Sequence, residues 1–470
     1  MHFTGDATLF VLDNEGILFS ESRQELYACN SPATFIWCCL EEGLALQEIT
    51  VAYASAFRMP QREAEKLVTD TLNQWQGLGY ITGLDIPAGS EIDLTTALGR
   101  LLTNPPLRKE FEKSPYETAR QLSLRQADRE AFVALSPQAL EMQAKTLQDR
   151  KLAQRQGLSA KGYENVVLSC LDRHANLLQG AAAARIRQLS SPSRKRYYRL
   201  LTTIFCIRFA TCAQEEMVHP VLAHLEIEEP AEIDVMLDLL QVAEGHLVLD
   251  DFVPVGHCAG LEQLAPIVKA AVKYMATNRY PYFLQIHAAV LYNGEKCILL
   301  PGGPGNGKTT LTAALACSGL QYFSDEIALL EEESMQVRPV PISLTVKPEA
   351  VDLLSPFYPE LRHLPVHCRE DQEIVRYLAP VSCAVSSSER TYSIGWVVFP
   401  RYSPDAETRL HPLSRASALQ RIMWECLVLP EPLNKRKVQS LVQWMREVEC
   451  FDLPMSSLAD AVQLVKGLCL

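Results

Sequence analysis

Cys297-Ile-Leu-Leu-Pro-Gly302-Gly-Pro-Gly-Asn-Gly307-Lys308-Thr309-Thr310 fits the pattern G-x-x-x-x-G-K-[ST] from residue 302 to residue 309. An apolar run precedes the glycines, and the helix-forming run Leu-Thr-Ala-Ala follows Thr310. A strand, a glycine-rich loop and a helix in this order form the phosphate-binding loop (P-loop) of nucleotide-binding proteins. The sequence therefore predicts an α/β nucleotide-binding domain in this part of the chain.

Each residue type in the motif has a physical role. Glycines let backbone N–H groups approach a phosphate without a Cβ in the way, and the new helix directs its positive end at the same charge. Lys308 supplies a cation for the terminal phosphates, and the Thr309 hydroxyl can bind Mg²⁺. The predicted nucleotide-contacting residues are Gly302, Gly303, Gly305, Asn306, Gly307, Lys308, Thr309 and Thr310.

Two further features flank the P-loop. Downstream, the apolar run Leu320-Gln-Tyr-Phe323 leads into Ser324-Asp325-Glu326. Two adjacent carboxylates after a strand can divide the work, one binding Mg²⁺ and the other accepting a hydroxyl proton; a solvated acidic turn is the alternative. Upstream, His287 begins another short apolar run, where a histidine is more often a core residue than a catalytic one.

This part of the chain resembles the core of HPr kinase/phosphorylase and its relatives in three features: His287, the P-loop and Asp325-Glu326. Those proteins share a phosphoenolpyruvate-carboxykinase-type nucleotide fold. The resemblance covers roughly residues 231–470. It implies ATP and Mg²⁺ as cofactors, with Lys308 and Thr309 at the phosphates. It also implies that Asp325 is the base or a metal ligand, that Glu326 is its partner, and that His287 lies against the phosphates.

The chain departs from that family in two ways. Glu326 stands where the HPr kinases carry a second Asp, and the downstream signature that engages HPr is missing, so HPr is not the expected substrate. Phe399-Pro-Arg401-Tyr402 resembles a segment common in these proteins. Arg401 could neutralise phosphate charge or form a surface salt bridge. Relatives are often oligomers, so a homo-oligomer is a further expectation.

Residues 1–86 have the pattern of a small winged-helix-like domain. Two predicted strands, around residues 9–12 and 16–19, flank the turn sequence Asp13-Asn-Glu-Gly16. Three amphipathic helices follow: one begins at Ser31-Pro32, and the others cover 46–56 and 64–78, the last ending at Gly77/Gly79.

This first domain also resembles a known family. Glu25-Leu-Tyr-Ala-Cys-Asn-Ser-Pro-Ala33 with Trp37, and then Trp75-Gln-Gly-Leu-Gly-Tyr80-Ile81, are similar to the PqqD-like peptide chaperone, also called the RiPP recognition element. That family binds the leader of a precursor peptide as an added strand, so a leader peptide is the expected partner of residues 1–86. An unrelated winged-helix domain is the alternative. Acidic residues on the strand side, Asp13, Glu15, Glu21 and Glu25, disfavour DNA.

The middle of the chain has a helical pattern. We predict a helical domain over residues 87–160, with proline-marked helix starts at Asn104-Pro105, Ser114-Pro115 and Ser136-Pro137, and an exposed linker near Gln154–Gly157. A helical linker domain is predicted over 161–230, and its basic-aromatic cluster Arg194-Lys-Arg-Tyr-Tyr-Arg199 favours a solvated helix face over an anion or nucleic-acid site. From residue 231 to 470, short β-rich runs alternate with helical stretches.

Composition excludes several classes of protein. The 470 residues include 44 Lys plus Arg against 56 Asp plus Glu, a formal charge of −12, which argues against a partner such as a nucleic-acid polymer. The longest apolar stretch is too short to span a membrane and contains Arg208. The 14 cysteines include no C-x-x-C pair, which is typical of a reducing, cytoplasmic setting. Histidine pairs at 219/224 and 363/367, the latter beside Cys368, have metal-like spacing but no cysteine pair to complete a zinc set.

These observations predict an α/β multidomain protein with three parts: a PqqD-like domain, a helical middle and an HPr-kinase-like domain. The leading hypothesis is an ATP- and Mg²⁺-dependent kinase that phosphorylates a Ser or Thr hydroxyl of a captured precursor peptide. In one alternative the enzyme uses phosphate only to activate a peptide or small molecule. In the other, a binding protein uses nucleotide to order its domains and transfers nothing.

Overall fold

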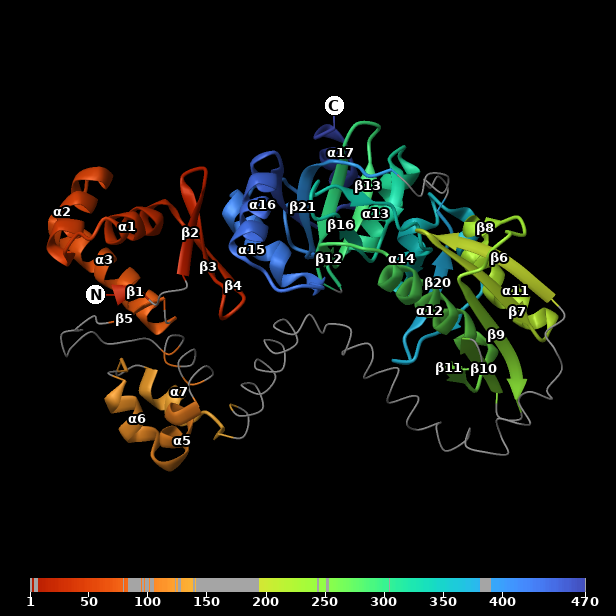
Figure 1. Ribbon diagram of the computed structural model, residues 1–470, viewed down its shortest axis with the longest axis horizontal. Helices are drawn as coiled ribbons and strands as arrows, with labels where there is room; N and C mark the ends of the chain where they lie inside the picture. The colour runs from red at the N-terminus through yellow and green to blue at the C-terminus, as the bar shows by residue number, and fades with distance from the viewer. Residues whose placement is uncertain are drawn as a thin grey trace. The chain divides into compact units, whose positions relative to one another are not determined.

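The computed structural model describes residues 2–3, 7–78, 80–82, 94, 97, 101, 105–122, 124–125, 128–137, 140, 194–242, 245–250, 253–303, 305–380 and 390–469. These residues form mixed α/β structure with several sheets (Figure 1). The chain divides into two compact units, Met1–Leu158 with Glu431–Val442, and Ser159–Pro430 with Gln443–Leu470. Both the predicted boundary near residue 160 and the predicted linker at 154–157 lie outside the described residues. No described helix is long and apolar enough to cross a membrane.

The N-terminal unit begins with an antiparallel sheet in the order β2-β3-β4, followed by three helices. Its elements are β1 (His2–Phe3), β2 (Ala7–Leu12), β3 (Glu15–Ser20), β4 (Glu25–Cys29), α1 (Ser31–Glu41), α2 (Leu46–Phe57), α3 (Gln61–Gly77) and β5 (Ile81–Thr82). The predicted hairpin and three helices are confirmed. The third strand, β4, was not predicted, although its residues belong to the stretch that carries the PqqD resemblance.

Local chemistry explains the start of α1. The Asn30 side chain accepts a hydrogen bond from the Ala33 N–H at 3.0 Å, and Pro32 occupies the first turn. The cap is therefore Asn30, one residue before the predicted Ser31. Trp37 of α1 and Trp75 of α3 then meet edge to face with ring centroids 5.2 Å apart in the centre of this domain. Both rings are buried, so truncating either to alanine would cost about 3–5 kcal/mol.

A separate helical core follows in the same unit. It contains α5 (Pro105–Lys113), α6 (Pro115–Gln121) and α7 (Arg129–Val133). Phe111 and Phe132 pack edge to face, 5.1 Å apart. The predicted helix starts at Pro105 and Pro115 are confirmed.

Residues 194–209 correct the prediction of a helical segment. They form two strands of a six-stranded sheet in the order β11-β10-β9-β7-β6-β8. The sheet and its helices are β6 (Arg194–Leu200), β7 (Thr203–Phe209), α11 (Cys212–Leu222), β8 (Glu226–Ile227), β9 (Val235–Val242), β10 (Gly245–Asp250), β11 (Val253–Cys258) and α12 (Leu264–Arg279). Five of the seven residues of β7 are aromatic or β-branched, and β6 contributes Tyr197 and Tyr198, residue types that favour a pleated surface over a helix. Because β7 pairs with β9, the sheet also continues across the predicted boundary at residue 230.

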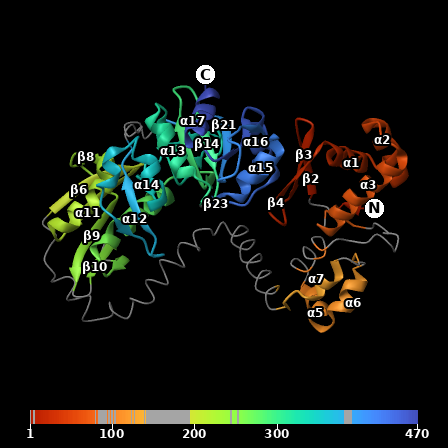
Figure 2. The ribbon, with the colours of Figure 1, turned by 180° about the vertical axis from the view of Figure 1, so that it is seen from behind.

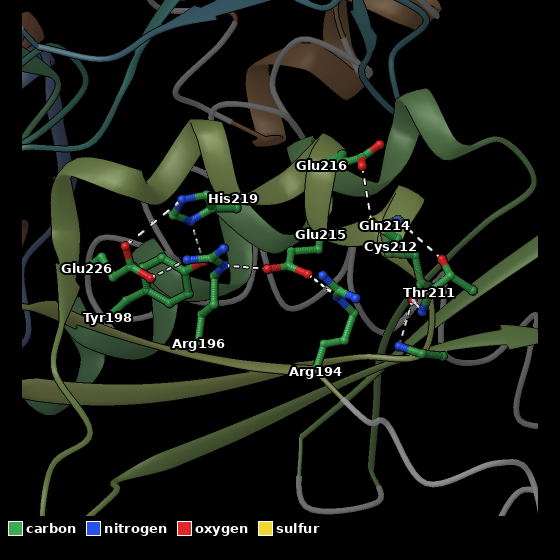
Figure 3. Close-up of polar contacts among 11 residues, drawn as sticks. Arg194, Arg196, Tyr198, Thr211, Cys212, Gln214, Glu215, Glu216, His219 and Glu226 are labelled. Atoms are coloured by element: carbon green, nitrogen blue, oxygen red, sulfur yellow. Dashed lines mark hydrogen bonds and ion pairs between the residues drawn. The ribbon is translucent and has the colours of Figure 1, made fainter.

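The basic-aromatic cluster lies on β6, and Arg194, Lys195 and Arg196 are paired with carboxylates, the two arginines as Figure 3 shows. Arg194 and Arg196 both bind the Glu215 carboxylate of α11. Arg196 also contacts Glu226, with Nη1 and Oε1 2.6 Å apart. Consequently the cluster is a charged surface of a strand that is joined to α11 by ion pairs, and not the predicted helix face.

A second six-stranded sheet holds the P-loop, in the order β15-β13-β14-β21-β24-β22. Its strands are β13 (Ala288–Tyr292), β14 (Cys297–Pro301), β15 (Gln321–Ser324), β21 (Ile394–Tyr402), β22 (His411–Pro412) and β24 (Glu449–Met455). Strand β14 runs parallel to β21, and β21 runs parallel to β24. Helices α13 (Lys308–Cys317), α14 (Pro348–Leu354) and α17 (Leu458–Gly467) share the core of this sheet (Figure 2).

The remaining strands of this unit form two smaller sheets, ordered β17-β16-β12-β23 and β18-β20-β19. Their bounds are β12 (Leu284–Ile286), β16 (Ala328–Leu330), β17 (Val337–Arg338), β18 (Leu344–Val346), β19 (His367–Cys368), β20 (Ile374–Leu378) and β23 (Cys426–Val428). Helix α15 (Arg415–Trp424) belongs to the same unit, whereas most of α16 (Lys435–Arg446) belongs to the N-terminal unit. The strands predicted within 246–249, 289–292, 297–300, 327–330 and 394–399 are all present.

Candidate functional site

The predicted P-loop connects the buried strand β14 to α13, as the motif requires. Two of its glycines have left-handed backbone conformations, Gly305 with φ +87° and Gly307 with φ +77°. A Cβ on Gly307 would lie 2.6 Å from Met455 Cε, and the left-handed φ of Gly307 favours glycine there. The loop therefore has the backbone of a phosphate cradle at the start of a helix.

Lys308 is the first residue of α13 and is buried. Its ammonium donates a hydrogen bond to the Gly302 carbonyl oxygen at 3.0 Å, which holds it across the loop. Burial lowers the pKa of Lys308, while Asp325, Glu425 and Glu326 act in the opposite direction. Thr309 and Thr310 follow on the same turn and are partly exposed.

Asp325 directly follows β15 and is 1% exposed. Neither carboxylate oxygen has a hydrogen bond of ordinary geometry within the described structure. Burial raises the pKa of Asp325 to about 6; Lys308, Lys269 and the Thr309 hydroxyl oppose that rise, and Glu326 adds to it. A buried carboxylate without hydrogen bonds is costly, and groups of this kind gather at functional sites.

Glu326 is placed differently from its neighbour. Its Oε1 lies 2.6 Å from Lys269 Nζ, and its Oε2 contacts Lys273 Nζ. Burial pushes the pKa of Glu326 upward, but the two lysines outweigh burial and hold the pKa well below its usual range. The two acids of the predicted pair thus have opposite surroundings.

His287 lies between β12 and β13, close to the P-loop. Its backbone N–H donates to the Glu425 carbonyl oxygen at 2.8 Å, and its Nδ1 is 3.9 Å from Glu425 Oε2. Burial lowers the pKa of His287 to about 4, with Lys308 and Lys273 contributing and Glu326 opposing. The imidazole is therefore neutral at pH 7.

Glu425 is a site residue that sequence reasoning missed. It caps the C-terminal end of α15 just before β23, and pairing of β23 with β12 brings it to His287. Burial raises the pKa of Glu425, opposed by Lys308 and Arg421. No motif surrounds Glu425, so only the strand pairing could reveal it.

Arg401, the other predicted phosphate cation, belongs to a surface pair. Its Nη2 lies 3.8 Å from Asp452 Oδ2, and its side chain is 60% exposed. Asp452 also binds Arg421, with Nη1 and Oδ1 3.0 Å apart. The salt-bridge alternative for Arg401 therefore agrees with the structure.

Oxygen donors at the P-loop suit Mg²⁺, which usually takes one or two carboxylates together with substrate phosphates. The unpartnered Asp325 carboxylate and the Thr309 hydroxyl are such donors. Among the described residues, no three or more His, Cys, Asp or Glu side chains lie together in a way that could hold a metal ion. His219 Nδ1 lies 3.0 Å from the Tyr198 hydroxyl, and His224 Nε2 contacts the Pro341 carbonyl, so both histidines have structural partners.

The N-terminal unit offers a second candidate site, between β4 and α3. Strand β4 is an edge of its sheet as far as the described residues go. Gln74 of α3 donates a hydrogen bond to the Tyr27 hydroxyl of β4 at 2.8 Å, which links the two elements. Leu67 and Leu78, at helical spacing from Gln74, are each 39% exposed. An open strand edge beside exposed apolar side chains can accept an extended peptide.

Comparison with known proteins finds little. No family model and no curated protein matches the chain. A solved structure described as "TbiB1 in Complex with the TbiA(beta) Leader Peptide" is similar to part of it. The alignment covers 18% of this chain and 100% of the other, with 20% identity and a TM-score of 0.18.

Proposed function

We propose that this protein is an ATP- and Mg²⁺-dependent kinase that phosphorylates a Ser or Thr hydroxyl of a precursor peptide. The N-terminal unit would capture the peptide's leader, and the site around Lys308 would carry out the transfer. The acceptor oxygen forms a bond to the γ-phosphorus, the bond to the β-phosphate oxygen breaks, ADP leaves, and the hydroxyl proton passes to Asp325.

Asp325 is the observation that carries the proposal. Its carboxylate is buried beside the P-loop, yet no hydrogen bond satisfies its oxygens. Phosphoryl transfer needs a carboxylate that orients or deprotonates the acceptor, and Asp325 beside the P-loop can do so. The raised pKa also makes Asp325 a better proton acceptor than an ordinary aspartate.

The other residues supply electrostatic stabilisation. Lys308 and the backbone N–H groups of the loop would bind the phosphates. Thr309 would hold Mg²⁺ together with the phosphates, and the bound ion neutralises charge on the phosphate oxygens. Neutral His287 can donate or accept one hydrogen bond to a phosphate oxygen or the acceptor, and Glu425 keeps the ring in place.

Leader capture rests on the resemblance to the PqqD-like family and on the open edge of β4. A leader added to this edge would gain main-chain hydrogen bonds from the strand and apolar contacts from Leu67 and Leu78. Holding the leader raises the effective concentration of the acceptor to roughly millimolar.

Mass spectrometry tests the proposal. The full chain is incubated with ATP, Mg²⁺ and each short peptide encoded beside its gene. We expect one peptide to gain the mass of one phosphate, and we expect Lys308→Ala to abolish the gain because the phosphates lose their cation. Lys347→Ala, which removes an exposed lysine of the same unit, is the matched control and should retain transfer.

The alternatives predict other outcomes of the same experiment. Nucleotide binding without a mass gain on any peptide would contradict the kinase and support a nucleotide-gated binding protein. A loss of water or a new amide bond that requires ATP would instead indicate that phosphate serves only to activate the peptide.

A further inference from the structure

Two lysines one turn apart on α12 converge on Glu326. Residues four apart share a face of a helix, so Lys269 and Lys273 reach the same carboxylate. Lys269 binds one oxygen of Glu326 and Lys273 binds the other. Each oxygen of the second predicted acid thus has its own ammonium.

Lys269 has a structural role in this arrangement. Its ammonium donates to the Thr345 hydroxyl oxygen at 2.7 Å, and that hydroxyl donates to Glu326 Oε1 at 3.0 Å. The Lys269 side chain is only 5% exposed and lies over the Tyr377 ring, 4.9 Å from its centroid. This closed triangle fixes the Glu326 carboxylate from one side.

Lys273 lies on the other side and remains 23% exposed. Its ammonium is held by Glu326, which is next to Asp325 in the chain. Lys273 also acts on the P-loop site, because it lowers the pKa of both His287 and Lys308. Lys273 is therefore a cation of the P-loop site that comes from outside the P-loop.

We propose that Lys273 binds the terminal phosphate of the nucleotide, and that Glu326 is a positioning residue for Lys273 rather than a metal ligand. The proposal rests on the nucleotide binding of the proposed function. A divalent cation on Glu326 would have to displace two ammonium groups from its oxygens. The protein ligand of Mg²⁺ is then Thr309, and Glu326 acts through the lysine it holds.

Nucleotide binding to the full chain tests this directly. Dissociation constants are measured for Mg²⁺ with ADP and for Mg²⁺ with a non-hydrolysable ATP analogue. Lys273→Gln should weaken binding of the analogue about tenfold, the loss of one charged hydrogen bond, and change ADP binding less than about twofold. Lys273→Arg should restore analogue binding to within about threefold, and Lys296→Gln, at an exposed lysine of the same unit, should leave both unchanged.

Glu326→Gln separates the two roles of the acid. If Glu326 is a positioning residue, the variant should lose affinity for the analogue but not for ADP, and the Mg²⁺ concentration for half-maximal binding should stay unchanged. A metal ligand predicts a higher Mg²⁺ requirement, and that result would overturn the proposal. So would equal weakening of ADP and analogue by Lys273→Gln. If the Glu326→Gln variant does not fold, the comparison of ADP and analogue binding in Lys273→Gln tests the proposal by itself.

The binding measurement uses no acceptor peptide, so it is independent of whether phosphate is transferred. Selective loss of analogue binding in a protein that phosphorylates no peptide would refute the proposed kinase and keep the role of Lys273. If the protein phosphorylates a peptide but Lys273→Gln weakens ADP and analogue binding equally, the proposed kinase stands and the role of Lys273 is refuted.

Discussion

At the scale of single residues, the charge on Asp325 lowers stability. Burial raises the pKa of this carboxyl from its ordinary value of 3.8 to about 6 in the folded protein. Above pH 6 the group is charged in both the folded and the unfolded state, and the folded state bears the cost of burying that charge. Below about pH 4 it is protonated in both states and the cost vanishes.

Asp325→Asn should therefore stabilise the protein while abolishing phosphate transfer. Without nucleotide or metal, we expect the variant to be more stable than the wild type by about 2 kcal/mol at pH 7.5, and by about half of that at pH 5. Thermal denaturation across this pH range measures the difference. A variant that is less stable at pH 7.5, or a gain that grows toward pH 5, would contradict the buried unpartnered charge.

His287 shifts stability in the opposite direction over the same interval. Its pKa falls to about 4 in the folded state, so the unfolded chain binds more protons between pH 4 and 6.5, and stability rises with pH there. Comparing Asp325→Asn with the wild type leaves the His287 contribution in both proteins. The difference between them reports mainly on Asp325.

At the scale of an element, the turn into α13 depends on the conformation of Gly307. Gly307→Ala adds a Cβ that meets Met455 and imposes a left-handed conformation on an L-residue. We expect a loss of about 1–2 kcal/mol in the free energy of unfolding, measured by denaturant titration without ligand. Gly303→Ala is the matched control, because its Cβ would meet nothing within 4 Å. Equal losses in both variants would contradict a special role for the Gly307 conformation.

At the scale of the whole molecule, the proposed function assigns peptide capture and phosphate transfer to different units of one chain. Leu67→Asp places a charge on the exposed α3 face beside β4 and should raise the KM for the precursor peptide about tenfold while leaving kcat unchanged, because only the effective concentration of acceptor falls. Steady-state kinetics and direct peptide binding both measure this effect.

Val51→Asp is the control for that change. Val51 is 55% exposed on α2 of the same domain, so the substitution adds the same charge elsewhere. Matching effects of the two substitutions, or a fall in kcat with an unchanged KM, would argue against a leader site at β4 and α3.

The sequence alone predicted the parts of this protein that depend on near neighbours in the chain. The strand before Gly302, the helix after Gly307 and the proline-marked helix starts follow from local backbone preferences, which act over a few residues. The same reasoning failed at residues 194–209, where pairing with β9 and packing in a sheet outweighed an apparent helical pattern.

Tertiary structure alone decided the surroundings of the charged groups. Asp325 and Glu326 are adjacent in the chain and equivalent as sequence, yet α12 brings two lysines to Glu326 and leaves Asp325 without a hydrogen bond. Pairing of β23 with β12 likewise brings Glu425 to His287. Burial and charge–charge energies depend on distance in space, which residue order does not specify, and for that reason these roles emerge only from the fold.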